Sequence, residues 1–283
     1  MAPDTTAYPT RTLNDGTAVP VVGFGTYPLR GEDGIAAIVS ALESGYRYLD
    51  TAVNYENESE VGEALRRSGL PRQDVRIATK IPGRNHAKSL ALQSLRDSAE
   101  RLGVDSIDVG LIHWPNPSQG LFHEAWEALV EAQREGLVTT VGVSNFTEAH
   151  LAAVIDRTGV TPALNQIELH PYFPQEGMRA VHERLGIQTQ AWSPLGKRSA
   201  PFAEAPVAKA AAAHGVTPGQ VILRWHLHLG SMPLPKSATP ERQRHNLDLL
   251  GFELTADEVA AITALGRPDG RLFGGDPDLH EEL

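Results

Sequence analysis

The sequence has no cysteine among its 283 residues and only three methionines. Without cysteine there can be no disulfide framework, no thiolate nucleophile, no iron–sulfur cluster and no thiolate zinc site. The absence is compatible with a reducing compartment, and it means that redox chemistry would need a cofactor from outside the chain. A chain of this length buries about three quarters of the surface of its unfolded form, so it can fold without cross-links.

Long apolar runs and an excess of positive charge are also missing. No apolar run approaches the roughly 18 residues that span a bilayer, and residues 1–10 lack the basic and apolar regions of a signal peptide. The 25 Lys and Arg are outnumbered by 35 Asp and Glu, and the resulting net charge of −10 opposes attraction to nucleic acid or to an anionic membrane. We therefore expect a cytoplasmic protein with neither of these partners.

Short apolar β-type runs alternate with helical patterns between about residues 20 and 250, and no linker divides them. This alternation predicts a parallel sheet, and eight strand–helix units suggest a (β/α)₈ TIM barrel. The β-type runs are VVGFG (21–25), YRYLD (46–50), VRIATK (75–80), IDVGLIH (107–113), TTVGVS (139–144), ALNQIEL (163–169), IQTQAW (187–192) and MPLP (232–235). Helical spacing is found in 34–42, 92–102, 122–130, 150–155, 178–185 and 218–229.

Additional segments are expected at both ends of the barrel. Asp15-Gly16 stands between two β-like runs, which predicts a hairpin over about residues 10–20 that could plug the bottom of the barrel. TADEVAAITAL (255–265) predicts one more amphipathic helix, and a Gly- and Asp-rich tail follows over about 266–283. We predict that residues 1–283 form a single domain.

Polar side chains close three consecutive predicted strands. Asp50 ends the second, Lys80 the third and His113 the fourth, and Tyr55 follows Asp50 in the loop DTAVNYENE. Each alone has an ordinary structural explanation, such as a cap or a surface charge. Active sites of such barrels lie at the carboxyl ends of the strands, so we expect the four side chains to meet at one rim.

These four residues suit proton transfer. A tyrosine has a pKa near 10, and a lysine cation within hydrogen-bond reach would stabilise its phenolate by ~1.36 kcal/mol per pKa unit. Lys80 would tune Tyr55 in this way, and Asp50 would hold Lys80 charged and oriented. His113 could hydrogen-bond a substrate carbonyl oxygen or relay the proton.

The chain resembles the aldo-keto reductase family from about residue 12 to about residue 275, most closely its bacterial branch that includes diketogluconate reductases. The resemblance lies in motifs that occur in the family's order and spacing: GFGTY (23–27), GYRYLDTAVNYENE (45–58), the lysine of IATK (77–80), LIHWP (111–115), VGVSNF (141–146), NQIELHP (165–171), AWSPLG (191–196) and PKSATPERQRHN (235–246).

The resemblance implies NADPH-dependent reduction of aldehydes or ketones to alcohols, with Tyr55 as general acid in a tetrad with Asp50, Lys80 and His113. It also implies the family's usual monomeric state and a small carbonyl substrate. By resemblance the cofactor would contact Thr26, Tyr27, Ser144, Asn145, Gln166, Trp192, Ser193, Leu195, Lys236, Ser237, Arg242 and Asn246. Substrate walls would come from Tyr27, Trp114, Leu272 and Phe273.

One part of this assignment has support from charge alone. Lys236, Arg242 and Arg244 form a basic patch around a predicted helix N-terminus in an acidic protein, which suits a phosphate. The preference for NADPH over NADH would depend on Lys236 and Arg242. Gln243 and His245 depart from the residues that relatives often carry near the adenine.

Two other functions remain open. The barrel could be a nucleotide-sensing regulatory module, or a metal-dependent hydrolase that uses Asp50, His113 and His170, although we expect no metal. A Rossmann fingerprint at Gly23 fails because Pro28 stands where its third glycine belongs. The His226-Leu227-His228 pattern lies on a predicted helix, where residues two apart point in different directions, so we expect it to be structural.

Overall fold

A computed structural model describes residues 8–197 and 201–282 of the chain. Its central sheet has eight parallel strands that neighbour one another in chain order. Each overlaps one of the predicted β-type runs, so those predictions are confirmed. The strands are β3 (Phe24–Gly25), β4 (Tyr48–Asp50), β5 (Arg76–Ile81), β6 (Ile107–Ile112), β7 (Val138–Ser144), β8 (Leu164–Glu168), β9 (Gln188–Trp192) and β10 (Met232–Pro233).

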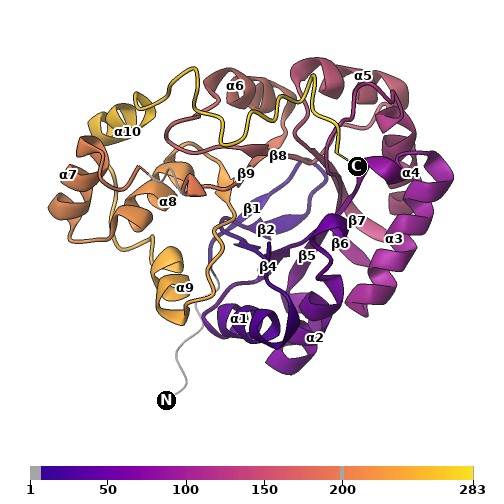
Figure 1. The fold of residues 1–283 in the computed structure, drawn as a ribbon, viewed down its shortest axis with the longest axis horizontal. Coiled ribbons are helices and arrows are strands. Elements are labelled where there is room, and N and C mark those ends of the chain that lie inside the picture. Colours follow the sequence, from indigo (N-terminus) through magenta and orange to yellow (C-terminus); the bar gives the residue numbers. More distant parts are fainter. Residues whose placement is uncertain (1–7, 198–200, 283) are drawn as a thin grey trace.

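The first and last strands of the sheet are joined as well. The Gly23 N–H donates to the Pro233 carbonyl at 3.1 Å, and the Gly25 N–H donates to the Pro235 carbonyl at 3.2 Å. These bonds bring β3 alongside β10, and the helices surround the strands in a ring (Figure 1). The predicted (β/α)₈ barrel is confirmed.

The helices cover the outside of the sheet. Thr147, Thr217 and Thr255 each accept a backbone N–H at a helix start, contributing about 1 kcal/mol apiece. The helices are α1 (Gly31–Glu43), α2 (Glu58–Ser68), α3 (Lys88–Leu102), α4 (Phe122–Arg134), α5 (Glu148–Thr158), α6 (Glu176–Leu185), α7 (Ala205–His214), α8 (Pro218–His228), α9 (Pro240–Leu247) and α10 (Ala256–Thr263). Short 3₁₀ turns are η1 (Val53–Tyr55), η2 (Arg72–Asp74) and η3 (Gly83–Asn85).

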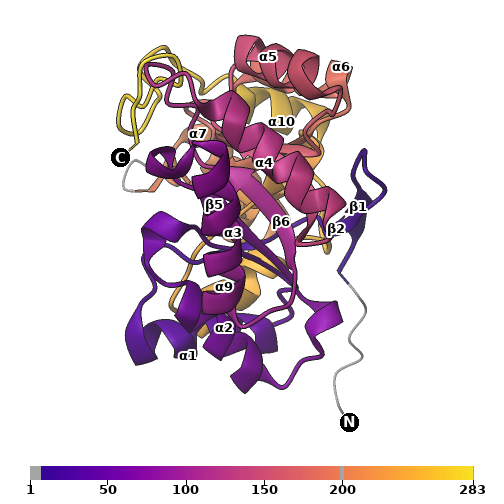
Figure 2. The same cartoon turned by 90° about the vertical axis from the view of Figure 1, so that its right-hand side faces the viewer.

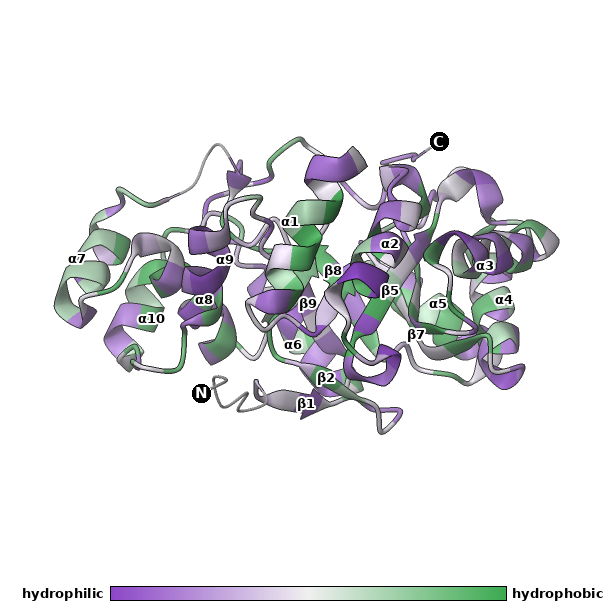
Figure 3. Ribbon diagram, turned by 90° about the horizontal axis from the view of Figure 1, so that it is seen from below, coloured by the Kyte–Doolittle hydropathy of each residue, from purple (hydrophilic) through white to green (hydrophobic). Residues whose placement is uncertain are grey.

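Two helices, α2 and α7, are absent from the predicted helical segments, and α9 was indicated only by the predicted helix N-terminus near Arg242. The run of alanines in α7 gives little contrast between its faces, although Val207 and Ala210 are buried. Only a few apolar residues of α2 turn inward, among them Val61 and Leu65. Figure 3 shows both hydrophilic and hydrophobic stretches on α2 and α3, as expected for helices with one face on the barrel.

The predicted hairpin is confirmed as β1 (Thr10–Thr12) paired with β2 (Ala18–Pro20). Gly16 adopts a φ of 85°, a conformation that glycine reaches without strain. Leu13 and Val19, 5% and 1% exposed, join the cluster of apolar side chains inside the barrel. The hairpin therefore closes one end of the barrel, and Figure 2 shows the segment after α10 at the opposite end.

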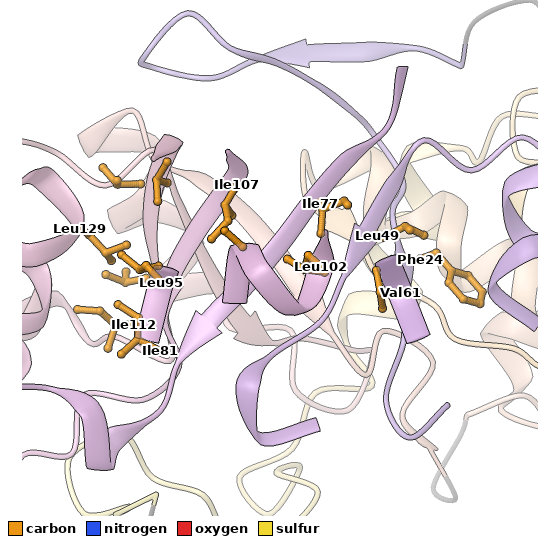
Figure 4. Close-up of a cluster of buried hydrophobic side chains, with 14 of the residues drawn as sticks. Phe24, Leu49, Val61, Ile77, Ile81, Leu95, Leu102, Ile107, Ile112 and Leu129 are labelled. Carbon is orange, nitrogen blue, oxygen red and sulfur yellow. The ribbon is translucent and has the colours of Figure 1, made fainter. Parts of the chain in front are cut away.

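The main core fills the layer between strands and helices. Leu95 and Leu102 from α3 and Leu129 from α4 lie in one cluster with Ile107 and Ile112 of β6, each at most 2% exposed (Figure 4). Each fully buried side chain of this kind stabilises the fold by about 1.5–3 kcal/mol. This layer holds the strands in place, and their carboxyl ends carry the polar residues described below.

Helices α2 and α3 approach each other at Gly62. A Cβ on this residue would lie 2.2 Å from the Leu102 carbonyl oxygen, so the backbones would have to separate. We expect Gly62→Ala to lower the free energy of unfolding by about 1–3 kcal/mol, measured by urea denaturation. Gly177→Ala on α6 is the matched control, because no atom lies within 4 Å of its added carbon. Equal stability of the two variants would contradict this account of the contact.

No helix within residues 8–197 and 201–282 is long and apolar enough to cross a membrane. Residues 1–7 and Leu283, which belong to the predicted single domain and its tail, lie outside the described residues. The rest of the predicted tail, through Glu282, belongs to the described part.

Candidate active site

A cavity of about 690 Å³ opens at the carboxyl ends of the barrel strands. Its lining comes from segments far apart in the sequence, which the barrel brings to one rim. The lining residues are Gly25, Thr26, Tyr27, Pro28, Asp50, Tyr55, His113, Trp114, Asn145, Gln166, Trp192, Ser193, Pro194, Leu195, Lys197, Phe202, Leu234, Pro235, Lys236, Arg242 and Phe273. Asp50, Tyr55 and His113 are therefore brought together, as the strand order predicts.

Lys80 and Asp50 form a buried ion pair beside the cavity. Lys80 Nζ lies 2.8 Å from Asp50 Oδ1 and 2.9 Å from Oδ2, and it also donates to the Thr51 carbonyl at 2.8 Å. The two side chains are 0% and 5% exposed. Burial lowers the pKa of Lys80, and the Asp50 carboxylate opposes that shift. Gln166 Nε2 donates to Asp50 Oδ1 at 2.7 Å and completes its environment.

Tyr55 lies in η1 with its ring packed between other site residues. Lys80 Nζ is 4.9 Å from the centre of the ring, and the ring centres of His113 and Tyr27 are 5.7 and 5.1 Å away. Burial raises the pKa of Tyr55 well above its usual range, and the negative charge of Asp50 adds to that shift. The phenol therefore keeps its proton at neutral pH.

The relation between Lys80 and Tyr55 differs from the prediction. The lysine was expected within hydrogen-bond reach of the phenol oxygen, but its ammonium lies against the ring. An ammonium has three N–H donors, and all three are taken by the two Asp50 oxygens and the Thr51 carbonyl. Lys80 therefore acts on Tyr55 in this structure through its charge and not through a hydrogen bond.

His113 directly follows β6 and is fixed through its backbone. Its N–H donates to the Ile81 carbonyl at 3.0 Å, and its carbonyl accepts from Asn145 Nδ2 at 3.0 Å. Its ring atom Nδ1 lies 2.7 Å from Glu282 Oε1, a residue that sequence reasoning missed. Nothing in the local sequence could have indicated this contact, because only the fold brings the tail back to β6.

The residues predicted to hold the nicotinamide form a connected polar group. Trp192 Nε1 donates to Asn145 Oδ1 at 2.8 Å, and Asn145 Nδ2 donates to Ser144 Oγ at 3.0 Å. Ser144 itself donates to the Gln166 carbonyl at 2.8 Å and lies behind the cavity wall. Asn145, Gln166 and Trp192 line the cavity, so of these four only Ser144 does not.

The residues predicted to bind phosphates lie along the same cavity. Ser193, Leu195, Lys236 and Arg242 line it, together with Lys197, which sequence reasoning missed. Lys236 and Arg242 are exposed, and neither forms an ion pair with a carboxylate in the described part of the chain. Two further predicted residues, Ser237 and Asn246, are buried and lie off the lining.

Three of the four residues predicted to form the substrate wall are aromatic side chains that line the cavity. Tyr27, Trp114 and Phe273 line the cavity, and Phe273 stacks on Trp192 with ring centres 5.5 Å apart. Leu272 lies off the lining, where its backbone N–H donates to Glu168 Oε1 at 2.7 Å. Phe202 is a lining residue that the sequence did not predict. The wall is largely apolar, as expected from these residue types.

The ligand set of a metal hydrolase does not assemble. Asp50 is engaged with Lys80, while His170 Nε2 pairs with Glu168 Oε1 at 2.9 Å. Among the described residues, no group of three His, Cys, Asp or Glu side chains could hold a metal ion. His226 is buried against the Pro194 carbonyl and Ser231, and His228 accepts the Leu254 N–H, so both have structural partners.

The residues that line the cavity fit a nicotinamide dinucleotide. Exposed cations line part of the cavity, and an indole ring, amide groups and a proton-bearing phenol line the rest. Cationic side chains bind phosphates, and flat aromatic rings pack on heterocycles. The fold and the site together define a barrel oxidoreductase whose electrons come from a bound cofactor.

Comparisons with known proteins point to the same class of enzyme. A model of the Aldo/keto reductase family matches residues 21–267. The 2,5-diketo-D-gluconic acid reductase B of a Corynebacterium species is 57% identical over 275 residues, covering 97% of this chain and 99% of the relative. Methylglyoxal reductase DkgA of Escherichia coli is 41% identical over 267 residues, covering 94% and 96%. The crystal structure of Bombyx mori aldo-keto reductase in complex with NADP aligns with a TM-score of 0.86 at 31% identity, covering 92% and 94%.

The chain belongs to the aldo-keto reductase family. It is therefore an oxidoreductase of small carbonyl compounds that depends on a nicotinamide cofactor. The predicted similarity to the bacterial branch of diketogluconate reductases is confirmed by the 57% identical relative. An enzyme is thereby favoured over a purely regulatory nucleotide-binding module.

Proposed function

We propose that this protein reduces aldehydes and ketones to alcohols with NADPH, and that Tyr55 is the general acid. The observation that carries the proposal is the meeting of Tyr55, His113 and the Asp50–Lys80 ion pair at one end of the cavity. Asp50 and Tyr55 come from the end of β4, Lys80 from β5 and His113 from the end of β6. Together they supply a proton, a hydrogen-bond donor and a fixed positive charge.

The reaction needs a hydride and a proton, and NADPH supplies the hydride when bound. The Tyr55 hydroxyl gives its proton to the carbonyl oxygen as the carbonyl carbon becomes saturated, and solvent later restores that proton. Burial keeps the phenol protonated beforehand, because it raises the pKa of Tyr55 well above its usual range. The Lys80 charge, 4.9 Å from the ring centre, stabilises the phenolate that follows.

The choice of NADPH over NADH is proposed from Lys236 and Arg242, which line the cavity without a carboxylate partner. We expect Arg242→Ala to weaken NADPH binding roughly ten-fold or more and to leave NADH binding nearly unchanged. Arg244→Ala is the matched control, because Arg244 lies on the same helix α9 but off the cavity lining. Equal losses for the two nucleotides would contradict a phosphate-binding role for Arg242.

Fluorescence titration with each nucleotide tests the proposal directly, because Trp192 lines the cavity and reports on its occupancy. Strong quenching by NADPH with a weaker NADH response is the expected result. Consumption of NADPH in the presence of a carbonyl compound would then establish turnover. Absence of both signals would overturn the proposal.

The substrate is proposed to be a carbonyl compound of modest size, because aromatic rings narrow the cavity around Trp114 and Phe273. Two compounds belong in the first panel: 2,5-diketo-D-gluconic acid and methylglyoxal, the substrates named in two relatives. We also propose that the chain acts as a single domain, as a monomer and in the cytoplasm. Sedimentation and fractionation of cells test the last two statements.

A further inference from the structure

The segment after α10 brings a carboxylate to the active-site histidine. Glu282 Oε1 lies 2.7 Å from His113 Nδ1, and both side chains are 12% exposed. The contact is an ion pair and not a linear hydrogen bond, since Nδ1 has no hydrogen-bond partner of good geometry. Nδ1 is buried, so Nε2 is the ring nitrogen left for the cavity that His113 lines.

Glu282 is held in place by groups that have no other assigned function. Asn54 Nδ2 donates to Glu282 Oε1 at 2.7 Å, and the Gly83 N–H points to Oε2 at 3.4 Å. The Asn116 side chain pairs with the backbone of Glu282, accepting its N–H at 3.2 Å and donating to its carbonyl. A Cβ on Gly83 would lie 2.3 Å from that carbonyl, so glycine leaves the room this approach requires.

The rest of the segment is anchored independently. The His280 ring packs on Trp114 with centres 4.2 Å apart, and the Leu272 N–H binds Glu168. Glu281 Oε1 accepts the Ser118 N–H at 2.8 Å. These three contacts and the pairing of Asn116 with the Glu282 backbone fix the segment without the Glu282 carboxylate. A neutral side chain at 282 should therefore leave its position unchanged.

The carboxylate that faces His113 is charged. Burial would raise the pKa of Glu282, but His113, Asn54 and the Gly83 N–H outweigh burial and lower it, so the carboxylate is ionised at neutral pH. The His113 ring also packs against Tyr55, which is uncharged, and the Asp50–Lys80 ion pair lies beyond Tyr55. Among the described residues, Glu282 is the carboxylate in contact with the His113 ring.

Three more ionisable groups lie near Glu282, among them Arg84, whose guanidinium donates to Asn54 Oδ1. Burial lowers the pKa of His86 to about 4, so this histidine stays neutral near pH 7. Glu281 Oε1 accepts the Ser118 N–H at 2.8 Å. Of these groups, only Glu282 is in contact with His113 Nδ1.

We propose that Glu282 is a positioning residue that holds a proton on His113 Nδ1, so that the charged ring can present an Nε2–H donor to the substrate carbonyl oxygen. The proposal rests on the carbonyl-reductase function above. A neutral histidine with its proton on Nδ1 could only accept at Nε2, whereas the charged ring donates from both nitrogens. The carboxylate thereby favours the form that can bind a developing oxyanion.

The direct test is ¹⁵N and ¹H NMR titration of His113 in the wild type, Glu282→Gln and Glu281→Gln. An opposite charge within this distance raises a histidine pKa by about one unit or more, so Glu282→Gln should lower the His113 pKa by that amount. Glu281→Gln removes the same charge one residue away and should leave it unchanged. An equal titration of His113 in all three proteins would overturn the proposal, whatever the enzyme's activity.

Kinetics separates this inference from the proposed function. In Glu282→Gln we expect kcat near pH 7 to fall about ten-fold while the Kd for NADPH stays the same, and the pH at which kcat declines should move down with the His113 pKa. Glu282→Asp should recover part of the loss, since it keeps the charge. If the wild type reduces no carbonyl compound, the proposed function fails while the NMR result still stands.

A purely structural effect of Glu282 is detected separately. Release of the tail would expose Trp114 and change its fluorescence, because His280 packs on that ring. Unchanged fluorescence together with a lowered kcat supports the positioning role. Altered fluorescence with an unchanged His113 pKa would instead make Glu282 only a tail anchor and would contradict the proposal.

Discussion

Tyr55→Phe is expected to lower kcat for carbonyl reduction by roughly 10²- to 10⁴-fold, the contribution usual for general acid–base catalysis. The change removes only the hydroxyl that would give its proton to the carbonyl oxygen. The ring, with its contacts to Lys80, His113 and Tyr27, stays in place. Steady-state consumption of NADPH measures the loss.

Binding and folding should be nearly unaffected by Tyr55→Phe. The hydroxyl forms no hydrogen bond with any described residue, so the free energy of unfolding should change by less than about 1 kcal/mol. The Kd for NADPH, measured by tryptophan fluorescence, should stay within a few-fold of the wild type. Retention of most of the activity would show that another group supplies the proton.

Lys80→Met is expected to lower the free energy of unfolding by about 3–5 kcal/mol and to abolish activity. The substitution leaves the Asp50 carboxylate buried without its cation, and Gln166 alone cannot compensate for the loss. Urea denaturation measures the difference. The control is Arg184→Met, because the Arg184–Glu148 pair is 59% exposed on each side and should contribute less than about 1 kcal/mol.

The loss of stability in Lys80→Met should also depend on pH, in a direction that can be predicted. A buried carboxylate without a cation destabilises the folded protein only while it is ionised, so this cost falls as the pH is lowered. A group with a raised folded pKa adds stability below its unfolded pKa and loses that contribution as the pH rises. The deficit of the variant should therefore be smaller at pH 5 than at pH 8. A deficit as small as that of Arg184→Met at both values would contradict the account of this ion pair.

Strands such as β6 (IDVGLI) were predictable because both of their faces are buried, so the sequence is a largely apolar run. Helix α5 was predictable from its apolar spacing and from Thr147 at its start. Helix α7 was not, because alanine is equally compatible with a buried and an exposed face. Periodicity therefore indicates an element only where its two faces differ in polarity.

For the site, the sequence by itself determined which chemistry was available. It placed Asp50, Lys80 and His113 at strand ends, so closure of the barrel was enough to bring them to one rim. The tertiary structure decided how those groups pair. It gave Lys80 the two Asp50 oxygens and the Thr51 carbonyl as its acceptors, placed Ser144 and Leu272 off the cavity lining, and brought Glu282 to His113. Hydrogen-bond direction and contacts between distant segments depend on the packed geometry, which no local pattern of residues encodes.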